Sequence, residues 1–252
     1  MSVASDRLDR EREHHDRLAA ALDPAAMPPV EFNGIDVAIL DAAEPLAGKH
    51  VLDLACGDGS LTIELLARGA TVTAVDLSPG MIALAERRIG LHAGRTATLV
   101  AAPAEDLPLD DASVDVVLGR FALHHLDLDL AAAEMARVLR PGGVGLFLEN
   151  SSRNRLLMFA RKHLAGRFGI PRLGTVDERP MSTDEVKQLG RHFSRAEMQH
   201  PFFCFFSIFN RQVLRYRWTR VNRLCDRLDH AVWRFLPGAR KWSFHVVVFL
   251  RK

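Results

Sequence analysis

The chain has 252 residues, of which 48% are hydrophobic and 25% are charged, and its formal net charge is +2. This balance is typical of a globular protein, excludes a largely disordered or coiled-coil chain, and gives no reason to expect a nucleic-acid partner. Its three cysteines, Cys56, Cys204 and Cys225, form no CxxC pair, so neither a disulfide framework nor a metal site is expected. The charged N-terminus lacks a secretory signal, and no apolar run approaches the roughly 20 residues of a membrane span. We therefore expect a cytoplasmic protein.

The first 44 residues predict an N-terminal helical cap. Helices are expected at residues 1–22 and 31–43, each followed by proline. Strands and helices then alternate through residues 45–150. The expected strands are residues 50–55, 71–76, 96–101, 113–119 and 144–149, and the expected helices are residues 60–68, 79–89 and 128–139. This alternation predicts an α/β fold with a Rossmann-like, doubly wound and mostly parallel sheet.

Residues 151–252 are expected to complete the same domain. Helices are predicted at residues 153–168 and 182–190, where Ser182 and Glu185 form a capping box. A strand at residues 195–203, a long helical stretch at 205–236 and a final strand at 244–250 follow. The sheet should thus have seven strands, with a helical insertion, residues 205–241, before the last one.

One short segment carries the strongest functional indication. Residues 51–60 read Val-Leu-Asp-Leu-Ala-Cys-Gly-Asp-Gly-Ser, so a strand runs into a glycine turn and then into a helix. At the carboxyl edge of a parallel sheet, such a turn is where ligands bind. Gly57 and Gly59 let the backbone approach a ligand closely and adopt positive φ at small cost.

The next strand ends at Asp76, 17 residues after Gly59, close to the spacing at which a carboxylate accepts hydrogen bonds from ribose hydroxyls. A dinucleotide favours a GxGxxG turn, but Thr62 occupies the third glycine position. Asp53 and Asp58 would repel a diphosphate, whereas they suit a ligand that carries ammonium and sulfonium groups. The charges favour S-adenosylmethionine (SAM) over NAD.

With these motifs, the sequence resembles the class I SAM-dependent methyltransferases of the small-molecule type. The resemblance spans roughly residues 48–150 and rests on five segments in order: residues 51–60, 74–81, 104–109, 120–126 and 137–143. It implies that SAM is the cofactor and that a small molecule accepts the methyl group.

The resemblance also implies residue roles. Asp53 and the backbone of Ala55, Cys56 and Gly57, in the turn that includes Asp58 and Gly59, would hold the methionine part, and Asp76 the ribose. Leu77 and Met81 would flank the adenine, while Ala104 and Glu105 would read its edge. Pro103 stands where many relatives have Asp, so adenine recognition would rest on the main chain or on Glu105.

Several residues have two interpretations. His124 and His125 follow the fourth strand and are candidate general bases, since an imidazole titrates near neutrality, or else structural or SAM-lining groups. Arg120 is a candidate cofactor contact, or it pairs with Glu134 or Asp127. His14 and His15 lie on the N-terminal helix, which in such enzymes often closes over the cofactor.

The insertion is basic and aromatic. Arg220, Arg223 and Arg227 recur at helical spacing as a basic stripe, and Leu224 and Leu228 belong to an apolar one. Three interpretations stay open: a lid helix that packs its apolar side on the core, a wall for a hydrophobic or anionic acceptor, and peripheral contact with anionic lipid.

The function expected from the sequence is SAM-dependent methyl transfer to a small, hydrophobic or anionic acceptor, with O- or C-methylation favoured. Two alternatives are kept: an NAD(P)-dependent oxidoreductase and a catalytically inactive SAM-binding scaffold. No ligand cluster for a metal is visible in the sequence.

Overall fold

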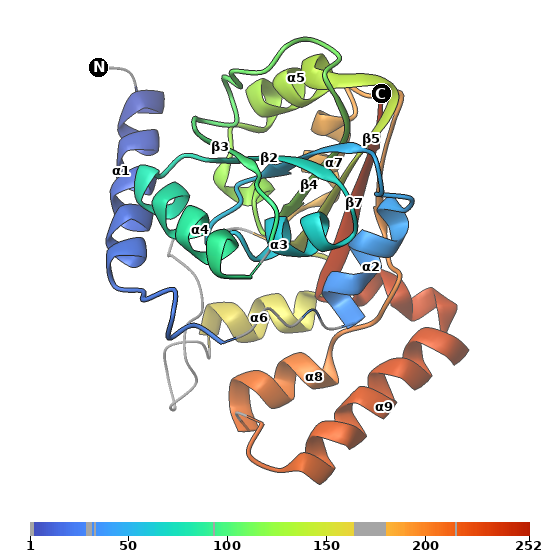
Figure 1. Cartoon of the computed structure of the whole chain (residues 1–252). Helices are drawn as coiled ribbons and strands as arrows, with labels where there is room; N and C mark the ends of the chain where they lie inside the picture. Colours follow the sequence, from blue (N-terminus) through green and yellow to red (C-terminus); the bar gives the residue numbers. More distant parts are fainter. Residues whose placement is uncertain (1–2, 29–31, 33, 93, 164–179, 215) are drawn as a thin grey trace.

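The computed structural model describes residues 3–28, 32, 34–92, 94–163, 180–214 and 216–252 (Figure 1). Its centre is a seven-stranded sheet in the order β3-β2-β1-β4-β5-β7-β6. The strands are β1 (His50–Leu54), β2 (Thr71–Asp76), β3 (Thr98–Ala101), β4 (Val114–Arg120), β5 (Leu139–Asn150), β6 (Arg195–Gln199) and β7 (His245–Arg251). Neighbours from β3 to β5 are parallel, and β7 is antiparallel to β5 and β6. The predicted Rossmann-like sheet is confirmed.

Helices cover both faces of the sheet, which is why its central strands are apolar on both sides. One face packs against α2 (Gly34–Ala43), α3 (Ser60–Ala67) and α4 (Pro79–His92), and the other against α5 (Leu128–Val138) and α7 (Thr183–Leu189). Helix α4 continues past Gly90, where the sequence predicted its end.

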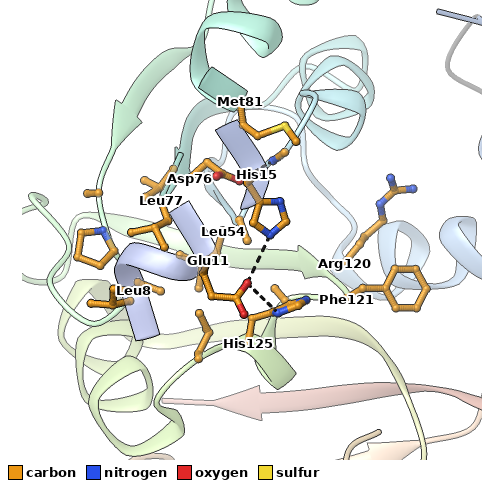
Figure 2. A pocket seen from close by; sticks show the side chains of 18 of the residues that line it. Leu8, Glu11, His15, Leu54, Asp76, Leu77, Met81, Arg120, Phe121 and His125 are labelled. Atoms are coloured by element: carbon orange, nitrogen blue, oxygen red, sulfur yellow. Dashed lines mark hydrogen bonds and ion pairs between the residues drawn. The ribbon is translucent and has the colours of Figure 1, made fainter. Parts of the chain in front are cut away.

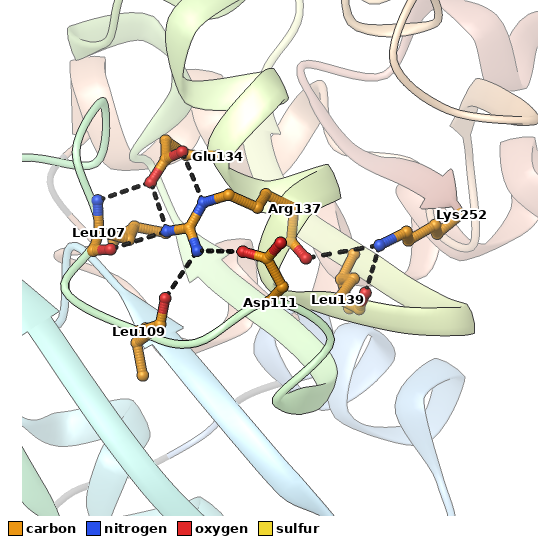
Figure 3. Close-up of polar contacts among 7 residues, drawn as sticks. All are labelled: Leu107, Leu109, Asp111, Glu134, Arg137, Leu139 and Lys252. Carbon is orange, nitrogen blue, oxygen red and sulfur yellow. Dashed lines mark hydrogen bonds and ion pairs between the residues drawn. The ribbon is translucent and has the colours of Figure 1, made fainter.

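The loop after β3 is fastened to α5 by one arginine (Figure 3). The guanidinium of Arg137 donates to the carbonyls of Leu107 and Leu109 and to the carboxylates of Glu134 and Asp111, over distances of 2.7–2.8 Å. These bonds fix the carboxyl-terminal part of a loop whose first residues face the candidate site described below.

Helix α1 (Val3–Ala20) forms the predicted cap and lies along α4 (Figure 1). The Asp16 carboxylate accepts hydrogen bonds from the hydroxyl of Ser78 and from the amide of Gly80, at 2.5 and 2.9 Å. A Cβ on Gly80 would lie 2.9 Å from the same oxygen. The glycine is therefore needed for the close approach of α1.

The insertion differs from its prediction. The predicted helical stretch over 205–236 is not continuous, because it divides into α8 (Phe206–Phe209), a π-helical turn (Asn210–Leu214) and α9 (Thr219–Phe235). Tyr216 lies between them with φ of 53°, a left-handed conformation that ends a helix. Strand β6 also ends at Gln199 and not at 203.

Two short 3-10 helices (Leu123–His125 and Pro237–Trp242) and α6 (Arg155–His163) complete the described elements. The end of the helix predicted at 153–168 lies outside the described residues. In the part of the chain that the structure describes, no helix combines the length and the apolar character needed to cross a membrane.

Candidate cofactor site

A cavity of about 400 Å³ lies at the carboxyl edge of β1, β2 and β4, beneath α1 (Figure 2). Its volume is in the range of small-molecule sites. Ten of the residues predicted for the site line it: Ala55, Gly57, Asp58, Asp76, Leu77, Met81, Ala104, Glu105, Arg120 and His125. These residues come from four separate loops, which the sheet brings together.

The turn after β1 has the backbone that its glycines allow. Gly57 and Gly59 have φ of 52° and 77°, and Ala55 has φ of 57° although it carries a side chain. The amide of Gly57 donates to Oδ2 of Asp76 over 2.9 Å. The turn of one strand is therefore tied to the carboxylate of the next.

Asp76 is 8% exposed, and burial raises its pKa above the ordinary value. Its other oxygen, Oδ1, accepts from the amide of Ser78 at 2.9 Å. Each carboxylate oxygen has a second lone pair, so both can also accept from a ligand. The two amide hydrogen bonds therefore fix the orientation of the Asp76 carboxylate in the cavity wall.

Four predicted site residues lie outside the cavity wall: Asp53, Cys56, Gly59 and His124. Asp53 is 1% exposed beneath the turn, where its Oδ2 accepts from the hydroxyl of Thr62 at 2.6 Å, and burial raises its pKa to about 7. Burial also raises the pKa of the Cys56 thiol, so that it stays protonated. Any influence of Asp53 on a ligand must pass through the turn.

His124 and His125 have different surroundings. Nδ1 of His124 lies 2.8 Å from Oε2 of buried Glu149, whose Oε1 accepts from the amides of Ala122 and Leu123. This network holds the short helix after β4. His125 faces the cavity, where its Nδ1 lies 3.4 Å from Glu11.

Helix α1 supplies part of the wall that the sequence prediction missed, apart from His15. The cavity is lined by Leu22, just after the helix, and by four residues of α1: Leu8, Glu11, His15 and Leu18. Their spacing of three or four residues places them on one helical face, which is a signal that the sequence did contain. His14 is not in the wall.

Two groups of polar contacts hold α1 over the cavity. Glu11 lies between His125 and His15 (Figure 2), at 3.4 and 3.7 Å, and hydrogen bonding to His125 lowers the pKa of Glu11. Hydrogen bonding to Glu11 in turn raises the pKa of His15. Arg7 donates to the carbonyl of His125 and, over 2.7 Å, to Oε1 of Glu105.

Glu105 has one oxygen to spare. Its Oε1 accepts from Arg7 and from the amide of Asp127, whereas Oε2 is buried without a hydrogen-bond partner among the described residues. A buried acceptor without a partner costs free energy unless something donates to it. This atom fits a ligand with an amino group.

Arg120 lines the cavity, but neither predicted ion-pair partner is correct. It pairs with Asp36 of α2 at 2.9 Å, and its guanidinium lies 5.1 Å from the ring centroid of Phe32. Glu134 is instead occupied by Arg137. The adjacent Phe121, with φ of 54°, also faces the cavity.

The turn contains a further ion pair. Asp58 pairs with Arg88, a buried residue of α4 that also donates to the hydroxyl of Ser60 and to the carbonyl of Pro28. Within the described residues, no group of three or more His, Cys, Asp or Glu side chains is placed to hold a metal ion.

Comparison with known proteins agrees with this geometry. Residues 52–147 match the protein family described as "Methyltransferase domain". An uncharacterized methyltransferase of Mycobacterium tuberculosis is 41% identical over 134 residues, or 52% of this chain and 53% of that protein. A demethylmenaquinone methyltransferase of Clavibacter sepedonicus is 42% identical over 108 residues, 42% of this chain and 43% of that protein. The chain thus spans about half the length of the curated relatives it matches.

Among solved structures, geranyl diphosphate C-methyltransferase from Streptomyces coelicolor, in complex with S-adenosyl-L-homocysteine, aligns with a TM-score of 0.57 at 13% identity. The alignment covers 85% of this chain and 76% of that one. At this identity the likeness concerns the fold. Residues 52–147 are therefore similar to a methyltransferase domain, and the chain shares its fold with that solved methyltransferase.

Proposed function

We propose that this protein transfers a methyl group from SAM to a small acceptor. The observation that carries the proposal is the cavity itself, which combines a glycine turn, an oriented strand-end carboxylate and a helical cap. Among the described residues, its wall contains the carboxylates of Glu11, Asp58, Asp76 and Glu105 and one guanidinium, that of Arg120. Asp58 and Glu105 are also paired with Arg88 and Arg7, but the wall itself has more carboxylates than guanidinium groups, which suits a ligand with an ammonium and a sulfonium group.

The parts of SAM have candidate partners in the wall. The two oxygens of Asp76 would accept from the ribose hydroxyls. Leu77 and Met81 would pack on the adenine, and Oε2 of Glu105 would accept from its amino group. The backbone of Ala55–Gly57 would contact the methionine part, above the buried Asp53.

SAM supplies an electrophilic methyl group, so the protein mainly has to align the acceptor and exclude water. Helix α1 covers the cavity, and its residues Leu8 and Leu18 would shield a bound cofactor from water. The acceptor would approach from the side of Arg120 and Phe121. Of the predicted pair, His125 lines the cavity and would contact a ligand, whereas His124 would act as a positioning residue through Glu149.

We further propose that the acceptor is a small hydrophobic molecule methylated on oxygen or carbon. Two observations support this: the apolar, aromatic insertion beside the site, and the name of the relative that acts on demethylmenaquinone, a small-molecule acceptor.

Calorimetric titration tests the cofactor. We expect SAM and S-adenosylhomocysteine to bind with 1:1 stoichiometry and NADPH not to bind. NADPH binding without SAM binding would overturn the proposal and favour an oxidoreductase.

A second experiment tests turnover. The protein is incubated with methyl-labelled SAM and small-molecule extracts, with Asp76→Ala as the matched control. Labelled product is expected from the wild type alone. Tight SAM binding without product in any extract would favour a scaffold over an enzyme.

A further inference from the structure

A second cavity, of about 690 Å³, lies between the beginning of α2 and the insertion. Its wall is partly polar and partly apolar, and six of its described residues carry aromatic rings. They are Phe202, Phe203, Tyr216 and Trp233, together with the imidazoles of His230 and His245. Such a wall suits a flat, largely apolar molecule.

His245 connects the two cavities. Its ring centroid lies 5.6 Å from that of Phe121, which lines the cofactor cavity. His245 begins β7 opposite Asn150, the last residue of β5, and so lies at the same sheet edge as the cofactor site. The two cavities share no described lining residue and meet at this ring pair, so a molecule in the second cavity would reach the proposed methyl donor past Phe121 and His245.

His245 has a hydrogen-bonding atom to offer. The residue is 5% exposed, and its buried Nδ1 has no partner among the described residues. Burial lowers the pKa of His245 to about 4, so the ring is neutral near pH 7. The ring nitrogens of a neutral imidazole donate or accept according to the tautomer, and a hydroxyl group can complement either one.

The charges of the wall do not favour an anion. Arg211 is its one described arginine, and Asp226 and Asp229 oppose it. Asp229 is engaged by the amides of Phe205 and Phe206 at the start of α8. The predicted arginine stripe of α9 is exposed and does not line this cavity.

We infer that the second cavity is the acceptor site, and that it binds a neutral aromatic molecule whose hydroxyl group hydrogen-bonds to Nδ1 of His245. The role of this molecule as methyl acceptor rests on the proposed function. The binding chemistry does not, since it follows from the aromatic wall and the imidazole.

Ligand-observed NMR with p-cresol and p-xylene tests this inference without any need for turnover. The two probes share their shape, and one lacks the hydroxyl. We expect p-cresol to bind roughly five- to tenfold more tightly, as one buried hydrogen bond allows. His245→Phe should remove this preference, while binding of S-adenosylhomocysteine stays intact.

A measurement on the wild type tests the inference even if His245→Phe does not fold. The Nδ1 resonance of His245 should shift with p-cresol and not with p-xylene. Equal binding of the two probes, no binding of either, or a shift with both would overturn the inference. If the wild type did not bind S-adenosylhomocysteine, that result would instead count against the proposed function.

An independent observation concerns the outer surface of α9, which lies at the periphery of the molecule (Figure 1). Its buried positions include Cys225 and Asp229, yet its apolar stripe is not packed on the core. Leu224, Leu228 and Phe235 are 55%, 39% and 72% exposed. The lid interpretation with a buried apolar side is therefore wrong for these residues.

A basic stripe runs beside the exposed apolar one. At 100° per residue, Arg220, Arg223, Arg227 and Arg234 fall on one side of Leu224 and Leu228. None of these arginines forms an ion pair with another described residue. Tyr216 and Trp218, just before α9, are exposed as well. Apolar, aromatic and unpaired basic groups together are typical of a helix that lies on an anionic bilayer.

We propose that α9 docks the protein on membranes that contain anionic lipid. The test is sedimentation with vesicles of phosphatidylcholine, with or without phosphatidylglycerol. Binding is expected to the mixed vesicles and to weaken with salt. Arg220→Gln/Arg227→Gln should lower the partition coefficient about 25-fold, at roughly a factor of five per charge.

The matched control is Arg87→Gln/Lys187→Gln, which removes two exposed charges elsewhere and should bind as the wild type does. Leu224→Ser/Leu228→Ser should also lose binding. Equal sedimentation of the α9 and control variants would overturn the proposal. The proposal would also be overturned if the wild type did not bind vesicles and instead formed a dimer, and if Leu224→Ser/Leu228→Ser were monomeric. In that case α9 would contact a second copy of the chain.

Discussion

The buried carboxylate under the turn makes the stability of this protein depend on pH. Asp53 has a pKa of about 7 in the folded chain, against 3.8 for an ordinary Asp, because burial disfavours its charge. The folded state therefore keeps this proton where the unfolded chain has released it. The stabilisation that comes from this proton is complete below the pKa that Asp53 has in the unfolded chain. It is lost as pH rises from that value through the pKa of Asp53 in the folded chain.

The size of the effect follows from the two pKa values. At about 1.4 kcal/mol per unit, the full penalty above pH 7 is about 4 kcal/mol. Part of it is already present at pH 5, so the loss between about pH 5 and pH 8 is about 2–3 kcal/mol. Asp53→Asn removes the titration but keeps an oxygen that can accept from Thr62.

Urea denaturation at both pH values measures this difference. The free energy of unfolding of the wild type should fall by about 2–3 kcal/mol more than that of Asp53→Asn between the two pH values. Other titrating groups are common to both proteins and cancel. Parallel pH profiles for the two proteins would refute the reasoning, and would mean that Asp53 is ionised at little cost.

Three further predictions concern the cofactor site. Asp76→Ala should weaken binding of S-adenosylhomocysteine by about 1–3 kcal/mol in calorimetry, and unchanged affinity would remove Asp76 from the site. Gly59→Ala should lower the free energy of unfolding by about 2 kcal/mol or more, since φ is +77° and the new Cβ would lie 3.0 Å from α4. Gly57→Ala, with φ of +52° and open space, is its control and should cost about 1 kcal/mol, so equal losses would argue against the clash. Because Glu11 raises the pKa of His15, their attraction is present below pH 6.5 and is lost as pH rises through the raised value. S-adenosylhomocysteine should therefore dissociate faster at alkaline pH, and a pH dependence that persists unchanged in His15→Gln would contradict this origin.

The sequence by itself determined the alternation of elements, the position of the glycine turn and the carboxylate that follows the next strand. These features are local, since apolar periodicity, glycine and chain spacing act over a few residues. They were sufficient to predict the seven-stranded sheet and ten of the residues that line the first cavity.

Tertiary structure alone decided how side chains pair across the sheet edge. Asp36 binds Arg120 across 84 positions, and Glu149 holds His124 across 25, which no local pattern can specify. The burial of Asp53 beneath the turn is likewise a tertiary feature that no local pattern can specify. Whether the apolar stripe of α9 is buried also depends on the rest of the fold, because amphipathic spacing states only that one helix face is apolar and leaves open what covers it.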